Sequence, residues 1–82
     1  MNKKRLLQRV LINQNNIKFE EFVVLVESFG FTLDRINGSH HIFKHPFLKT
    51  LINLQIVNNE AKPYQVRQFL KIIEKHNLKM RD

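Results

Sequence analysis

The chain has 82 residues, room for one domain, and its 14 Lys and Arg against 7 Asp and Glu give a formal net charge of +7. It contains no cysteine, so neither a disulfide framework nor a thiolate metal site is expected. There is no recognisable signal peptide and no apolar run near the roughly 18 residues of a membrane span, so we expect a cytoplasmic protein without a membrane partner. Bases strongly outnumber acids after Asp34, which favours a polyanionic partner such as nucleic acid.

The first half of the chain begins with two predicted helices. Apolar residues at helical spacing predict a short basic helix over residues 3–12, and an Asn-rich turn follows at residues 13–16. A second helix is predicted over residues 19–29, where Phe19, Phe22 and Val26 lie on one stripe. Gly30 is expected to end it. Lys18 is a poor N-cap for this helix.

Residues 31–43 are predicted to form a β-hairpin, because Asn37-Gly38 is a strong signal for a two-residue type I′ turn. With these two residues in the turn, Arg35 pairs with His40 and Asp34 pairs with His41. His40 then shares a sheet face with Arg35, Leu33 and Ile42. The opposite face carries His41 together with Asp34, Thr32 and Phe43.

A third strand is predicted over residues 50–57, after a bend at Pro46, and Asn58-Asn59-Glu60 turns the chain. Pro63 then opens a last helix that runs to about Asn77. The predicted fold class is α+β: an extra N-terminal helix followed by an α-β-β-β-α two-layer sandwich, in which the second and last helices cover one face of the sheet.

The hairpin histidines are the main candidates for chemistry. A histidine beside an arginine can exchange protons near neutral pH while the arginine holds a phosphate, as cleavage of an RNA phosphodiester requires. His41 beside Asp34 is a rival pair, and an ordinary structural strand histidine is the alternative to both. Spacing does not choose between them. No metal site is expected, because His40 and His41 point to opposite faces and His41 lies about 13 Å along the strand from His45.

The last helix carries a basic ladder of Arg67, Lys71 and Lys75, with Lys62 and Lys79 near its ends. Such a ladder can follow a phosphate backbone, although a solvated helix face gives the same pattern. Tyr64 fits two interpretations, a base-stacking residue or a residue at the edge of the core. The phenylalanines at 19, 22, 29, 31, 43 and 69 are expected to pack in the core.

The segment Phe29-Gly30-Phe31 followed by Asp34-Arg35-Ile36-Asn37-Gly38-Ser39-His40-His41-Ile42-Phe43-Lys44-His45-Pro46 resembles the HicA toxins of bacterial HicA/HicB systems, over roughly residues 19–77. The resemblance implies a metal-independent mRNA interferase with a double-stranded-RNA-binding-domain-like fold and no cofactor. It also implies a HicB-type antitoxin that covers the active site. By the same resemblance His40, the first histidine after Gly-Ser, is the catalytic residue, presented by a turn containing Asn37 and Gly38.

Two departures from the short family pattern are visible: the N-terminal helix, and a third strand after which no histidine occurs until His76. We therefore expect an N-terminal extension over residues 1–16, a HicA-like domain over residues 17–82, and no scheme with two catalytic histidines. The hypothesis is that the 2′-hydroxyl of mRNA is the nucleophile and His40 the general base or acid. The expected RNA-binding residues are Arg35, Ser39, His41, Lys44, Lys62, Arg67 and Lys71.

Two other classes of function fit the same charge and fold. A non-catalytic double-stranded-RNA-binding module would bind duplexes without cutting them and would tolerate the loss of His40. A protein interaction module would use the basic face to meet an acidic partner and would have little affinity for RNA even at low salt.

Overall fold

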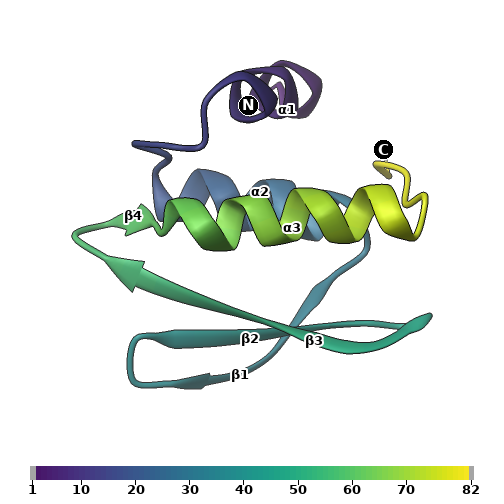
Figure 1. The fold of residues 1–82 in the computed structure, drawn as a ribbon. Helices are drawn as coiled ribbons and strands as arrows, with labels where there is room; N and C mark the ends of the chain where they lie inside the picture. Colours follow the sequence, from purple (N-terminus) through teal and green to yellow (C-terminus); the bar gives the residue numbers. More distant parts are fainter. Residues whose placement is uncertain (1, 82) are drawn as a thin grey trace.

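The computed structural model describes residues 2–81, and this part of the chain forms three helices and a four-stranded antiparallel sheet in the order β1-β2-β3-β4 (Figure 1). The fold is α+β, as the element pattern predicts, and it is consistent with the double-stranded-RNA-binding-domain-like fold that the resemblance implies. The elements in chain order are α1 (Lys3–Ile12), α2 (Phe19–Ser28), β1 (Thr32–Asn37), β2 (His40–His45), β3 (Leu48–Val57), β4 (Glu60–Ala61) and α3 (Pro63–Lys75).

The helices lie on one side of the sheet. In Figure 1, α2 and α3 form a layer above the strands, and α1 lies on top of this layer, on the side away from the sheet. The side chains of Phe22, Phe43 and Phe69 are at most 1% exposed and fill the space between the helices and the sheet. Phe69 meets Phe22 edge to face with 5.5 Å between ring centroids. All six phenylalanines predicted to pack in the core are buried.

Helix α1 belongs to the same core as the rest of the chain. Leu6 and Val10, one turn apart, are 5% and 0% exposed. Arg9 on the neighbouring face forms an ion pair with Glu21 of α2 at 3.0 Å. Because the apolar side of α1 packs on the helix layer, this segment adds a third layer above the predicted two-layer sandwich.

Helix α2 is capped by backbone groups rather than by its N-cap side chain. Lys18 makes no side-chain cap hydrogen bond. Instead the backbone N–H of Phe19 donates to the carbonyl of Asn59 at 2.8 Å, so the turn between β3 and β4 satisfies one free N–H of the helix. At the other end Gly30 adopts a φ of +97°, which favours glycine, and it follows the C-cap residue Phe29, so Gly30 stops the helix as expected.

The hairpin turn differs from the sequence prediction. Asn37 is the last residue of β1 and pairs with His40, so the two turn residues are Gly38 and Ser39 rather than Asn37 and Gly38. Gly38 has a φ of +61°, whereas Asn37 and Ser39 are absent from the residues with positive φ. A positive φ at the first turn position alone is the pattern of a type II′ turn, whereas type I′ requires it at both positions. The glycine therefore determines the turn.

The predicted strand pairing is consequently wrong, although one of its main consequences is confirmed. Arg35 pairs with Ile42, and the register shifts between Leu33 and Arg35 at a β-bulge. Between the bulge and the turn, the observed pairing is shifted by two residues from the predicted one. A shift of two residues leaves each side chain on its predicted face, so Arg35 and His40 do share one face. On the side of the bulge away from the turn, Leu33 pairs with Phe43. This pairing places Leu33 on the helix-facing side of the sheet instead of beside His40.

Smaller differences occur at element ends. Strand β3 starts at Leu48 rather than Thr50, and the short strand β4, which was not predicted, pairs with Ile56 and Val57 of β3. Helix α2 ends at Ser28 and α3 ends at Lys75, one and two residues before the predicted ends.

Candidate functional site on the open face of the sheet

The sheet face away from the helices, here called the open face, carries the polar side chains of β1, β2 and β3. Strand alternation from the observed pairing places Arg35, His40 and Ile42 on this face, with Asn53 and Gln55 of β3 opposite Ile42 and His40. In Figure 1 all three helices lie on the other side of the sheet. The open face is therefore available to a ligand.

His40 is held by an amide on the neighbouring strand. Its Nδ1 atom lies 3.0 Å from the Oδ1 atom of Asn53. Because an amide oxygen only accepts hydrogen bonds, the ring must donate from Nδ1, which leaves Nε2 of the neutral imidazole as an acceptor. The contact fixes the ring orientation and leaves the second ring nitrogen, Nε2, free of the Asn53 side chain.

A second amide on β3 holds the turn that precedes His40. Gln55 Nε2 donates to Ser39 Oγ at 3.2 Å, and the backbone N–H of Ile56 donates to the Ser39 carbonyl at 3.1 Å. Ser39 therefore serves the turn. Both the turn and the imidazole that follows it are tied to the central strand β3.

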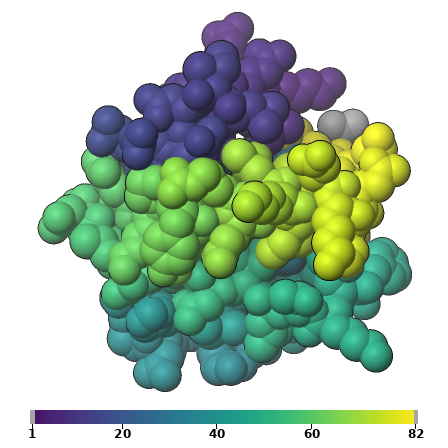
Figure 2. All heavy atoms as spheres, viewed as in Figure 1, coloured from purple at the N-terminus to yellow at the C-terminus, as the bar shows by residue number. Residues whose placement is uncertain are grey.

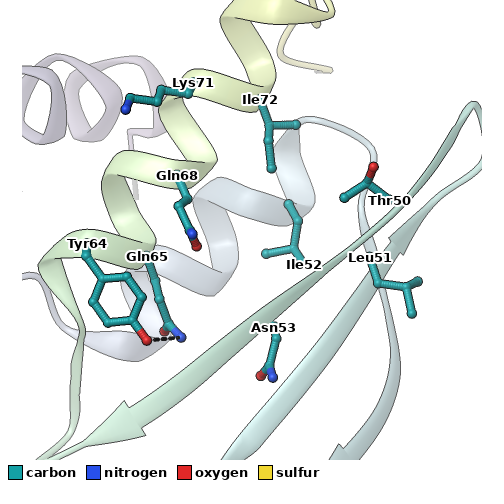
Figure 3. Close-up of a pocket in the computed structure, with 9 residues that line it drawn as sticks. All are labelled: Thr50, Leu51, Ile52, Asn53, Tyr64, Gln65, Gln68, Lys71 and Ile72. Atoms are coloured by element: carbon teal, nitrogen blue, oxygen red, sulfur yellow. Dashed lines mark hydrogen bonds between the residues drawn. The ribbon is translucent and has the colours of Figure 1, made fainter.

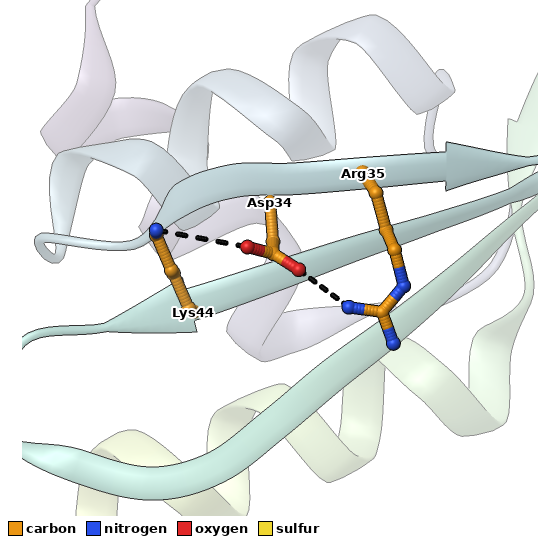
Figure 4. A network of polar contacts seen from close by, with 3 residues as sticks. All are labelled: Asp34, Arg35 and Lys44. Carbon is orange, nitrogen blue, oxygen red and sulfur yellow. Dashed lines mark hydrogen bonds and ion pairs between the residues drawn. The ribbon is translucent and has the colours of Figure 1, made fainter.

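Three charged residues form a network on the open face (Figure 4). The Asp34 carboxylate forms ion pairs with Arg35 and with Lys44, the latter at 3.6 Å. The bulge in β1 explains this, because it turns Asp34 toward the side of the sheet that carries Arg35. The side chains of Arg35 and Lys44 remain 61% and 58% exposed, so both cations are accessible to a phosphate.

His41 is separated from Asp34 and lies on the helix-facing side of the sheet. Its ring packs against Phe19 of α2 with 4.8 Å between centroids, and its Nδ1 atom lies 3.3 Å from the Ser39 carbonyl. The rival pair of His41 and Asp34 does not exist, because the register shift and the bulge place the two residues on opposite faces.

His45 is a structural histidine. It is 5% exposed, Nδ1 accepts the backbone N–H of Phe47 at 3.2 Å, and Nε2 donates to the Phe29 carbonyl at 3.1 Å. Both ring nitrogens are thus used inside the fold. Of the three histidines of β2, only His40 lies on the open face.

The predicted basic residues of α3 lie in the helix layer and not beside His40. Lys62 Nζ lies 5.8 Å from the centroid of the Tyr64 ring, and Arg67 is exposed on the surface of the helix. Lys71 lines a groove of about 560 Å³ between α3 and the outer edge of β3 (Figure 3). This groove reaches Asn53, the residue that holds His40.

Asn53 and Gln55 were not singled out from the sequence. A signal for them exists: they are polar residues at alternate positions of an otherwise apolar strand, which places both on the face opposite the core. What the sequence lacked was the pairing of β3 with β2, which brings Asn53 next to His40. Within residues 2–81, no three His, Asp or Glu side chains are grouped so that they could hold a metal ion.

The fold and the open face define a class of protein: a small basic α+β domain of the double-stranded-RNA-binding type, with one histidine held on an accessible sheet face. A family model described as the HicA toxin of bacterial toxin-antitoxin systems matches residues 19–74. This is more than half of the chain, and the chain therefore belongs to the HicA toxin family. The match covers α2, the sheet and nearly all of α3, and it begins after α1.

Membership of this family supports a toxin function, a toxin-antitoxin partner and a nuclease role in general. No curated protein and no solved structure gives a significant match to the chain. The helices in the described part of the chain fall short of the length and apolar character that a membrane crossing requires.

Proposed function

We propose that this chain is the toxin of a type II toxin-antitoxin system and that it is a metal-independent endoribonuclease that cleaves mRNA with His40 as general base and acid. Family membership supports the toxin and nuclease parts of this proposal. The assignment of His40 rests on its surroundings. Its Nδ1 atom lies 3.0 Å from Oδ1 of Asn53, and its side chain shares the open face with the cations of Arg35 and Lys44.

The reaction follows from this arrangement. The scissile phosphate of mRNA binds the exposed guanidinium of Arg35, Lys44 contacts a neighbouring phosphate, and Nε2 of His40 accepts the proton of the 2′-hydroxyl next to the scissile phosphate. The 2′-oxygen then attacks phosphorus while the bond from phosphorus to the 5′-oxygen breaks. The 5′-oxygen takes a proton from the imidazolium, which gives a 2′,3′-cyclic phosphate and a 5′-hydroxyl and returns His40 to its neutral form. DNA lacks the 2′-hydroxyl and is not a substrate.

A single histidine serves both proton transfers in this scheme. His41 and His45 lie on the helix-facing side of β2, where Phe19 and the Phe29 carbonyl contact them. We assign His41 to support of the turn through the Ser39 carbonyl. Lys62, Arg67 and Lys71 extend the RNA-binding surface from the edge of β3 onto α3.

The proposal includes the organisation of the chain and its partner. We assign residues 1–16 to an N-terminal helical extension and residues 17–82 to the HicA-like domain. A HicB-type antitoxin neutralises the toxin by covering the open face, including His40, and the reaction takes place in the cytoplasm, where mRNA is translated. No cofactor enters the scheme.

The test is to induce the chain and its His40→Ala variant in a bacterial host and to follow growth and transcript cleavage, with circular dichroism of both purified proteins. We expect only the original chain to arrest growth and to cut RNA, also in the presence of a metal chelator. Equal cleavage by a folded His40→Ala protein removes His40 from the mechanism. Binding of duplex RNA without cleavage by either protein identifies a binding module instead.

A further inference from the structure

The groove between α3 and β3 takes no part in the proton transfers proposed above, and of the α3-side bases assigned to RNA binding only Lys71 lines it. It is bounded by exposed Tyr64, Gln68 and Lys71 on the helix side and by β3 on the other (Figure 3). The complete lining is Thr50, Leu51, Ile52, Asn53, Tyr64, Gln65, Gln68, Lys71 and Ile72. Its volume of about 560 Å³ is within the range of small-molecule sites.

An aromatic ring is held in place at this groove. Tyr64 is 49% exposed, and its hydroxyl accepts from Gln65 Nε2 at 3.4 Å. Gln65 itself is only 6% exposed, and its Oε1 atom accepts the backbone N–H of Gln55 at 2.8 Å. The tyrosine is therefore tied through a buried amide to β3, and its ring is presented to solvent at little entropic cost on binding.

Within residues 2–81, no strand pairs with the outer edge of β3 along the groove. Strand β4 pairs only with Ile56 and Val57. The backbone N–H of Gln55 points to this edge, because Gln65 of α3 accepts it. By strand alternation the N–H and C=O of Asn53 point to the same edge, where they are available to the donors and acceptors of a nucleobase.

The groove and the open face meet at a single residue, Asn53. Asn53 lines the groove and also holds Nδ1 of His40 at 3.0 Å. An RNA strand whose phosphate lies at His40 therefore reaches the groove by passing over the edge of β3. Lys71 supplies a positive charge for a neighbouring phosphate at the groove.

We propose that this groove binds one unpaired nucleotide next to the scissile phosphate, with its base stacked on Tyr64 and its edge read by Gln68 and the Asn53 backbone. The inference rests on the proposed ribonuclease function and adds a subsite that gives the enzyme its sequence preference. It requires single-stranded RNA, since a paired base exposes neither its faces nor its Watson–Crick edge.

The test compares Tyr64→Leu, which removes the aromatic ring, with Tyr64→Phe, which keeps the ring and removes only the hydroxyl. Cleavage of a single-stranded RNA pool is mapped by sequencing, and KM and kcat are measured on one cleaved oligonucleotide. Loss of base stacking in Tyr64→Leu is expected to raise KM about tenfold or more with a smaller change in kcat, whereas Tyr64→Phe stays near the original. Gln68→Leu is expected to weaken the base preference at one position beside the cut.

Glu74→Gln is the matched control, because Glu74 is an exposed residue of the same helix, lies outside the groove and does not belong to the basic ladder. Unchanged KM and base preference in both Tyr64→Leu and Gln68→Leu overturns the proposal, as does equal loss in Glu74→Gln. If Tyr64→Leu only weakens neutralisation by a HicB-type antitoxin, the groove binds protein and the RNA subsite is wrong.

The two proposals fail in different ways. If the original chain cuts no RNA, the ribonuclease function is wrong. The groove is then still tested by fluorescence anisotropy of a labelled single-stranded oligoribonucleotide with the His40→Ala protein. In that assay Tyr64→Leu in the same background is expected to lose about tenfold in affinity, and equal affinity overturns the subsite.

Discussion

The Nδ1 atom of His40 and the Oδ1 atom of Asn53 lie 3.0 Å apart across the β2–β3 pairing. The two residues are 13 positions apart in the chain, and the contact exists because Asn53 is diagonal to His40 on the open face. A neutral amide fixes the orientation and tautomer of the ring without adding charge. This distinguishes the site from histidines that are oriented by a carboxylate.

Asn53 is expected to be a positioning residue for His40. Asn53→Leu removes the hydrogen bond to Nδ1 but keeps the imidazole, so kcat should fall by about tenfold to a hundredfold, less than the roughly 10²–10⁴-fold that general acid–base catalysis contributes in full. Asn53→Asp should keep the contact but add a negative charge that stabilises the imidazolium. Since the base must then lose its proton at higher pH, the rising limb of the pH–rate profile moves to higher pH.

Gln55→Leu is the matched control for this prediction, because Gln55 lies on the same strand and face but contacts Ser39 instead of His40. Its pH–rate profile should stay in place. A profile that is unmoved in Asn53→Asp, with kcat retained in Asn53→Leu, shows that Asn53 has no part in proton transfer.

Arg35 and Lys44 are expected to contact RNA phosphates, and each contact has a salt signature. Replacing either by alanine should reduce the slope of log affinity against log salt by about 0.7, the value for one phosphate contact with a single strand. Binding is measured by anisotropy over a range of salt concentrations in the His40→Ala background. Lys4→Ala in α1, on the far side of the helix layer (Figure 2), should leave the slope unchanged.

Asp34 belongs to the same prediction, because its carboxylate binds both cations. Asp34→Asn removes a negative charge beside the phosphate and should raise affinity for RNA at low salt. A fall in affinity instead means that Asp34 matters mainly for holding Arg35 and Lys44 in position.

The sequence predicted the elements well and the contacts between them less well. Helices and strands follow from apolar spacing, Gly30 and Pro63, which act within a few residues. The prediction of the turn residues was wrong because Asn37-Gly38 and Gly38-Ser39 are both acceptable residue pairs for a two-residue hairpin turn. Only the strand pairing, which depends on the bulge after Leu33, decides between them. The short strand β4 depends on pairing with β3 and has no local signal of its own.

The same limit applies to the site. The sheet face that His40 shares with Arg35 was predicted, since it depends on residues within one hairpin. The choice of His40 over His41 came from the family resemblance and not from the spacing. Asn53, Gln55 and the α3–β3 groove depend on contacts between elements distant in sequence, so the pattern of residues did not reveal them. The basic ladder of α3 was visible, but its separation from His40 by the sheet edge was not.

The two glycines of the chain should respond differently to alanine. At Gly30, with a φ of +97°, a Cβ would lie 2.9 Å from the end of the Arg81 side chain, which can move aside, and 3.0 Å from Nε2 of His45, which is buried and hydrogen-bonded through both ring nitrogens. At Gly38, with a φ of +61°, an added Cβ would have no non-neighbouring atom of residues 2–81 within 4 Å. Gly38→Ala should therefore lower the free energy of unfolding by about 1 kcal/mol through backbone strain alone, and Gly30→Ala by about 2–3 kcal/mol. Urea unfolding of both variants measures this difference, and equal losses contradict the predicted clash.

Helix α1 lies outside the region matched by the family model, yet it is expected to stabilise this chain. Val10 is 0% exposed against the helix layer, whereas its neighbour Leu11 is 55% exposed. Val10→Ala leaves a cavity and should lower the free energy of unfolding by about 2 kcal/mol, while Leu11→Ala should change it by less than about 0.5 kcal/mol. Neither should alter kcat, because α1 is separated from the open face by the layer of α2 and α3 (Figure 1). Urea unfolding and RNA cleavage by the two purified proteins decide the matter. A loss of activity in folded Val10→Ala means that the extension influences the site, and equal stability of the two variants means that α1 does not contribute to the core in solution.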